Sequence, residues 1–143
     1  LGMRQAEVAR RFDEIVGFAG VEAFVDSPVK HFSTGMQMRL AFAVAVHLPV
    51  EVLLMDEGLA VGDAGFQKRC LAKLSALVRE GRTLLLVGHN LTAIRTVCTR
   101  ALWLDKGKVV RAGAVEEVAE AYAAAATGGA ALQPLPAPGV RSG

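Results

Sequence analysis

Short apolar runs alternate with helically spaced apolar positions along the chain, and this pattern predicts a mixed α/β protein. Residues 52–55 and 83–87 form two short, almost wholly apolar runs. Such runs are typical of strands buried on both faces, so we expect a parallel sheet with helices on both sides. Between them, residues 65–79 carry apolar side chains at the spacing of a helix core, at Phe66, Cys70, Leu74, Leu77 and Val78. The three segments predict one β-α-β unit.

Two further helices are expected before this unit. Residues 3–18 have apolar side chains at helical spacing (Val8, Phe12, Ile15 and Val16) and reach Gly17 and Gly20. A short piece at residues 21–25 follows and is broken by Asp26-Ser27-Pro28. The second helix should begin with Ser33 or Thr34 as its N-cap and run to about residue 48, because Pro49 ends it.

The sequence pattern of the last part of the chain predicts a hairpin, a helix and a tail. Residues 101–105 and 108–111 flank Lys106-Gly107 and read as two short antiparallel strands. Residues 115–126 are rich in Ala and Glu, which favours a helix. From Thr127 onward the chain consists mainly of Gly, Ala, Pro and Ser, and we expect these residues to be flexible.

Composition narrows the class of protein. The 143 residues are 52% hydrophobic and 21% charged, as in soluble globular domains. A net charge of +2, with both signs interspersed, does not indicate a nucleic-acid-binding protein. No apolar run approaches the roughly 20 residues of a membrane-spanning helix. Cys70 and Cys98 form no Cys-x-x-Cys motif, so free thiols are expected.

The start of the second helix is a candidate phosphate-binding site. Helix N-termini present unpaired N–H groups and the positive end of the helix dipole. In the segment Ser33-Thr34-Gly35-Met36, Ser33 supplies a hydroxyl donor, and Gly35 allows close approach to the backbone. Ordinary helix capping would explain the same residues.

Acidic residues and a histidine follow the two apolar runs. Of the adjacent acids Asp56 and Glu57, one could hold Mg²⁺ while the other reaches a nucleophilic water, because neighbouring side chains of an extended chain point in opposite directions. Gly62-Asp63 forms a tight loop in which Asp63 could equally be an N-cap. His89 ends the second run and could contact a terminal phosphate or be structural. For Asp56 and Glu57, an ordinary acidic loop is the alternative.

The order of these features resembles the second half of an ABC-transporter nucleotide-binding domain, over about residues 1–122. Residues 32–36 resemble the signature motif, residues 52–57 the Walker B strand, Gly62-Asp63 the D-loop and His89 the switch histidine. The stretches FSTGMQMRLAFAVA and LLMDEGLAVGDAGFQKRC are most similar to exporters of polysaccharides such as O-antigen or teichoic acid. The sequence departs from the common family pattern at Thr34, Met36, Gly58, Gly88 and Asn90, and several of these departures look typical of this branch.

The resemblance implies a fold and a division of the chain into three segments. It implies a partial P-loop NTPase (RecA-like) parallel sheet, with a helical signature subdomain at 1–48, the ATPase core at 49–126 and a flexible tail at 127–143. The sequence contains no G-x-x-x-x-G-K-[ST] loop, which this family uses to hold ATP phosphates. We therefore expect part of a longer protein that is inactive alone, in which the strand at 83–87 has an unpaired edge.

The resemblance also implies a mechanism with ATP and Mg²⁺ as cofactors. Residues 33–36 would reach the γ-phosphate held by an opposing copy. Asp56 would hold Mg²⁺, Glu57 would polarise the attacking water, His89 would contact the γ-phosphate, and Asp63 would communicate across the dimer.

The implied partners are a second nucleotide-binding domain, arranged head to tail, and a membrane-spanning permease that docks on residues 3–47. No nucleic acid is expected, and the protein would lie peripherally on the cytoplasmic face of the cell membrane. Two alternatives stay open. One is a non-enzymatic α/β interaction module. The other is an ABC-type ATPase of chromosome maintenance or DNA repair, although no sustained heptads follow here.

Overall fold

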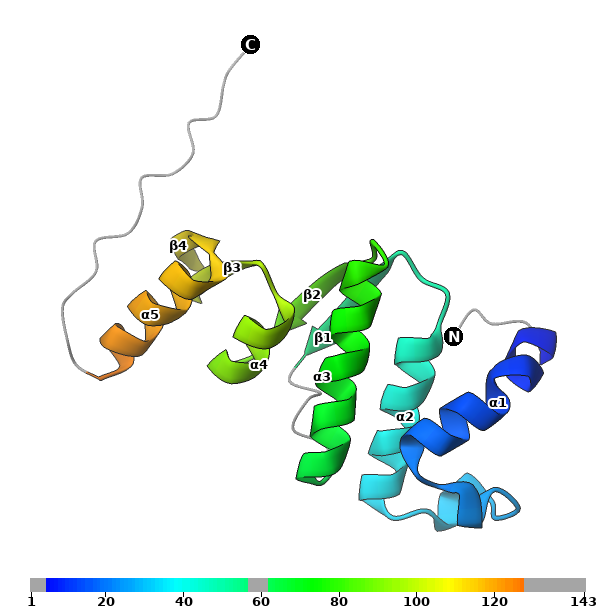
Figure 1. Ribbon diagram of the computed structural model, residues 1–143. Coiled ribbons are helices and arrows are strands. Elements are labelled where there is room, and N and C mark those ends of the chain that lie inside the picture. The colour runs from blue at the N-terminus through cyan, green and yellow to red at the C-terminus, as the bar shows by residue number, and fades with distance from the viewer. Residues whose placement is uncertain (1–4, 57–61, 128–143) are drawn as a thin grey trace. The chain divides into compact units, whose positions relative to one another are not determined.

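The computed structural model describes residues 5–56 and 62–127, which belong to two compact units, Leu1–His89 and Asn90–Gly143 (Figure 1). Both units combine helices with strands, which confirms the predicted α/β class. No helix among the described residues is long and apolar enough to cross a membrane. Cys70 is buried and Cys98 half-buried, and both are free thiols, as predicted.

The first unit begins with two packed helices. Helix α1 (Gln5–Ala19) contacts helix α2 (Thr34–His47), and two short 3₁₀ segments, η1 (Glu22–Phe24) and η2 (Val29–His31), connect them. Both helices match their predicted ranges within one or two residues. Phe12 is 46% exposed, although its spacing had placed it with the other apolar residues of α1. The core between the helices is formed by Ile15, Val16, Ala19, Val21, Phe32 and Ala43.

A β-α-β unit follows, as predicted. Strand β1 (Val52–Asp56) pairs in parallel with β2 (Thr83–Val87), and helix α3 (Ala64–Arg79) connects them. Among the described strands, β2 pairs only with β1, and the unpaired edge that the resemblance implied stays an expectation. The α3 side chains Phe66, Cys70, Leu74 and Leu77 are buried, and Val78 is half-buried.

The prediction that both faces of this sheet are buried is wrong for the described residues. Directly paired residues share a face of a sheet, and alternate residues point to opposite faces. One face carries Leu53 and Leu84, which line a small apolar cavity together with Leu74 and Leu77 of α3. The opposite face carries Val52, Leu54, Leu85 and Val87, which are 51–65% exposed. A continuous apolar run therefore does not reveal which face a helix of the same unit covers.

The second unit is a hairpin flanked by helices. Strands β3 (Arg100–Asp105) and β4 (Lys108–Ala114) pair antiparallel, and helices α4 (Leu91–Val97) and α5 (Val115–Ala126) precede and follow them. Lys106 and Gly107 both have positive φ (46° and 76°), as a tight hairpin turn requires. The hairpin and α5 confirm the prediction, whereas α4 was not predicted. Residues 128–143, most of the expected tail, lie outside the described residues.

Candidate functional site

Ser33 caps the N-terminus of α2. Its backbone is extended (φ −61°, ψ 156°), and its Oγ accepts a hydrogen bond from the Met36 N–H at 3.2 Å. A Cβ built at Gly35 would meet only Ser33 Oγ, at 4.0 Å, so the backbone there is open to approach. No acidic residue lies in the first turn. The capping interpretation is correct, and because Oγ is the acceptor in this bond, its O–H remains able to donate to a phosphate oxygen.

Asp63 occupies the equivalent position at the start of α3. Its Oδ1 accepts the Phe66 N–H at 2.9 Å, and this hydrogen bond, with the positive charges of Arg69 and Arg39, lowers the pKa of the carboxyl group. Gly62 precedes it with φ +78°, and a Cβ there would come within 3.0–3.2 Å of the Phe66 side chain. Gly62 and Asp63 thus have a local structural role, and their role as a D-loop that communicates across a dimer stays a prediction.

Asp56 and His89 lie at one edge of the β1–β2 sheet. Asp56 pairs with Val87, and His89 follows two residues later, so the carboxyl ends of the parallel strands bring the two together. Both residues are exposed. Glu57, the predicted catalytic carboxylate, lies outside the described residues.

One exposed carboxylate at the strand end fits Mg²⁺ that arrives with phosphate. Mg²⁺ is usually bound through one or two carboxylates, waters and substrate phosphates, not by a cage of protein groups. In residues 5–56 and 62–127, no three His, Cys, Asp or Glu side chains cluster as a metal site. Asp56 could therefore hold Mg²⁺ only together with phosphate oxygens and water.

The candidate residues fall on different elements. Ser33, Thr34, Gly35 and Met36 lie at the beginning of α2, while Asp56 and His89 lie on the sheet. Helix α2 has 14 residues and is therefore about 21 Å long. It runs beside α3, with Phe42 and Phe66 in edge-on ring contact, and both helices begin at the same end of the pair (Figure 1).

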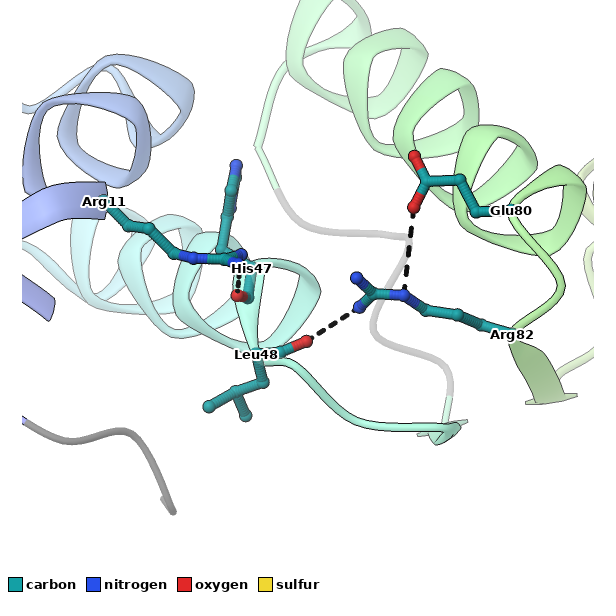
Figure 2. A network of polar contacts seen from close by, with 5 residues as sticks. All are labelled: Arg11, His47, Leu48, Glu80 and Arg82. Atoms are coloured by element: carbon teal, nitrogen blue, oxygen red, sulfur yellow. Dashed lines mark hydrogen bonds and ion pairs between the residues drawn. The ribbon is translucent and has the colours of Figure 1, made fainter. Parts of the chain in front are cut away.

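The C-terminal end of α2 holds a polar network that the sequence did not indicate. Figure 2 shows Arg11 and Arg82 reaching it from opposite sides. Arg11 Nη1 donates to the His47 carbonyl at 2.7 Å, and Arg82 Nη1 donates to the Leu48 carbonyl at 2.8 Å. Arg82 Nε also lies 3.9 Å from Glu80 Oε2. Neither arginine belongs to a motif, and their partners lie 36 and 34 residues away, so no local pattern could have found them.

His47 and three phenylalanines form an aromatic cluster beside this network. The Phe18 ring lies 6.2 Å from Phe42, 5.5 Å from His47 and 5.7 Å from Phe66. His47 is 5% exposed, and its Nδ1 lies 2.7 Å from the Ala43 carbonyl. Burial lowers the pKa of His47. The cluster joins α1, α2 and the first turn of α3.

Comparison with known proteins identifies relatives over most of the chain, although no family model matches. The chain is 48% identical over 122 residues to an O-antigen export system ATP-binding protein of Myxococcus xanthus. It is 43% identical to an ABC transporter protein of Aeromonas salmonicida and 37% identical to a teichoic acids export ATP-binding protein of Bacillus anthracis, again over 122 residues each. Each match covers 85% of this chain but only 28%, 40% and 22% of the respective relative. The chain thus spans well under half the length of these proteins.

Solved structures share the fold. An ATP-binding subunit of an ABC transporter matches with a TM-score of 0.73 at 23% identity, over 85% of this chain and 51% of that one. A dimeric ATP-binding cassette in a post-hydrolysis state, bound to ADP and Pi, matches with a TM-score of 0.65 at 23% identity, over 80% of this chain and 50% of that one. These likenesses show that the chain shares its fold with part of each of those two chains.

Proposed function

We propose that this chain, which is homologous over 122 residues to part of the ATP-binding proteins of O-antigen and teichoic acid exporters, is part of an ABC-type ATPase that drives polysaccharide export. The observation that carries the proposal is the arrangement of the motif residues within this homology. An open helix N-terminus bears Ser33 and Gly35, and one sheet edge bears Asp56 and His89. Taken alone, the helix N-terminus could be an ordinary cap, and Asp56 could belong to an ordinary acidic loop.

The two groups lie on different elements, α2 and the β1–β2 sheet, and we assign them to two different nucleotides. Residues 33–36 would donate hydrogen bonds to the γ-phosphate of ATP held by a second copy of the domain. Asp56 and His89 would act at the nucleotide bound to their own domain, where Asp56 helps to hold Mg²⁺ and His89 contacts the γ-phosphate. Bound Mg²⁺ would neutralise charge on the phosphates. Glu57 would orient and polarise the attacking water, a role that rests on its position directly after Asp56.

The names of the relatives support the wider assignment. Export of a polysaccharide requires a membrane-spanning partner, and we place its docking surface on the helical region, residues 3–47. The protein would then act at the cytoplasmic face of the cell membrane. The division into a signature subdomain, an ATPase core and a tail, at 1–48, 49–126 and 127–143, belongs to this proposal.

A chimera tests the enzymatic assignment. The matched 122 residues of the Myxococcus xanthus relative would be replaced by those of this chain, and phosphate release from ATP measured. We expect hydrolysis that Glu57→Gln abolishes while calorimetry still detects ATP binding. Glu51→Gln is the matched control, because Glu51 is an exposed acid before the other end of β1. Equal hydrolysis with Glu57→Gln would contradict the assigned role.

The same chimera separates the alternatives. A folded chimera, verified by circular dichroism, that binds no ATP would favour a non-enzymatic interaction module. Hydrolysis that rises on addition of double-stranded DNA would instead favour an ATPase of chromosome maintenance or repair. Hydrolysis that DNA leaves unchanged supports the exporter assignment.

A further inference from the structure

The last carbonyl groups of α2 cannot be satisfied by continuing the helix. Pro49 follows Leu48 and has no N–H, so it cannot donate back into the helix. The Leu48 N–H donates to the Ala45 carbonyl at 3.3 Å, which leaves the His47 and Leu48 carbonyls to find other partners. Both lie among well-buried residues, since His47 is 5% and Leu48 8% exposed. Donors from elsewhere in the fold are therefore needed here.

Two guanidinium groups supply them, each from a different element (Figure 2). Arg11 extends from α1 to the His47 carbonyl, and Arg82 extends from the residue before β2 to the Leu48 carbonyl. Positive charge at a helix C-terminus is also favoured by the helix dipole. The two contacts fix the end of α2 to its neighbouring helix on one side and to the sheet on the other.

Arg82 is itself held in place. Its N–H donates to the Leu77 carbonyl at the end of α3 (3.1 Å), and the next residue, Thr83, donates to the Glu51 carbonyl beside β1 (2.9 Å). The Arg82 side chain is 26% exposed, and Glu80 lies near its Nε. The guanidinium group therefore reaches α2 from a backbone that is anchored on both sides.

We propose that Arg82 is a positioning residue: by holding the C-terminal end of α2 against the sheet, it sets the orientation of Ser33 and Gly35 at the other end. An α-helix behaves as a stiff rod, and a tilt of about 10° at one end of this one would move its other end by about 4 Å. Catalysis is sensitive to displacements of about 1 Å in groups that contact the reacting phosphate. The contribution to ATP hydrolysis rests on the proposed function, whereas the contact itself does not.

Arg79 provides a matched control for Arg82. It also carries a guanidinium group near the end of α3, but in the part of the chain that the structure describes its Nε donates to the Ser75 carbonyl of its own helix, at 3.2 Å, and to no residue of α2. Replacing either arginine by methionine removes one positive charge and keeps the aliphatic stem. Only Arg82→Met removes a contact with α2.

Amide hydrogen exchange on the chain itself tests the contact. We expect Arg82→Met to speed exchange across α2 about tenfold, because a hydrogen bond from a charged donor is lost, whereas Arg79→Met leaves α2 unchanged. Arg82→Lys, which keeps a cationic donor, should give a smaller increase and serves if the methionine variant does not fold. Equal exchange in α2 for the variants of Arg82 and Arg79 would overturn the proposal.

Kinetics of the chimera test the positioning role. We expect Arg82→Met to lower kcat several-fold while the affinity of the monomer for ATP stays the same. The reason is that residues 33–36 would contact the nucleotide of the second copy, not the one bound to their own domain. Combined with Ser33→Ala, it should add little further loss, because both changes act on the same phosphate contact. An unchanged kcat, or fully additive losses, overturns positioning. A chimera that binds no ATP refutes the proposed function but not the contact between Arg82 and α2. Amide hydrogen exchange on the chain itself still tests that contact.

Discussion

Replacing Phe66 by alanine is expected to destabilise the first unit strongly. Phe66 is 0% exposed. Its ring makes edge-on contacts with Phe18 and Phe42, at 5.7 and 6.0 Å, and the Arg69 guanidinium lies 5.5 Å from its centre. The ring therefore joins α1, α2 and α3, and its removal leaves a cavity where the three helices meet.

The expected loss follows from this burial. Truncation of a fully buried phenylalanine costs about 3–5 kcal/mol, which includes the lost ring contacts at roughly 0.5–1.5 kcal/mol each. A domain of ordinary stability has only about 5–15 kcal/mol in total. Phe66→Ala should thus remove a large fraction of the free energy of unfolding. Phe66→Leu, which keeps much of the volume, should cost about 1–2 kcal/mol.

Urea unfolding followed by far-ultraviolet circular dichroism measures the effect. Phe12→Ala is the matched control, because Phe12 lies on α1 and is 46% exposed, and its truncation should cost no more than about 1 kcal/mol. A loss below about 1 kcal/mol for Phe66→Ala, or one equal to that of the control, would refute the inference that the ring holds the three helices together.

Three further changes have defined outcomes. In the unfolded state His47 is protonated with its ordinary pKa of 6.5, whereas burial lowers its pKa in the folded state. The free energy of unfolding should therefore fall as the pH drops below about 6.5. Urea titrations at several pH values should show a flatter pH dependence for His47→Gln. Ser33→Ala removes the N-cap bond to Met36 and should cost about 0.5–2 kcal/mol in thermal melts, whereas Ser33→Asn should retain most stability. Gly62→Ala places a Cβ against Phe66 at positive φ and should lower Tm by several degrees, with an unchanged Tm as the contrary result.

The helix starts were accessible from sequence because capping is local. Ser33 and Asp63 bond to N–H groups three residues later, so residue type and position suffice to predict them. Asn90 caps α4 by the same rule, through the Ala93 N–H at 3.1 Å. That helix was missed because its seven residues give too little periodicity to recognise. Asn90, as a possible N-cap followed by Leu91, was the signal in the sequence that could have predicted this helix.

The sequence predicted where the two strands lie and that they pair in parallel, but not which of their faces are buried. Their apolar composition and the helix between them predicted parallel pairing, which the register confirms. The side chains of Leu54 and Leu85 nevertheless lie on an exposed face, which composition cannot reveal because strands buried on one or both faces can carry the same apolar run.

Apart from α4 and its cap Asn90, the sequence by itself determined the order of the helices and strands, the caps at Ser33 and Asp63, and the motif residues, since each depends on neighbours within a few positions. The predicted parallel strands already placed Asp56 and His89 at their carboxyl ends, whereas only the tertiary structure decided that Phe18, Phe42 and Phe66 meet. It alone placed Arg11 and Arg82 on the end of α2, across 36 and 34 residues of chain. Such contacts depend on how helices pack against one another and against the sheet, and that packing brings together residues that no local pattern connects.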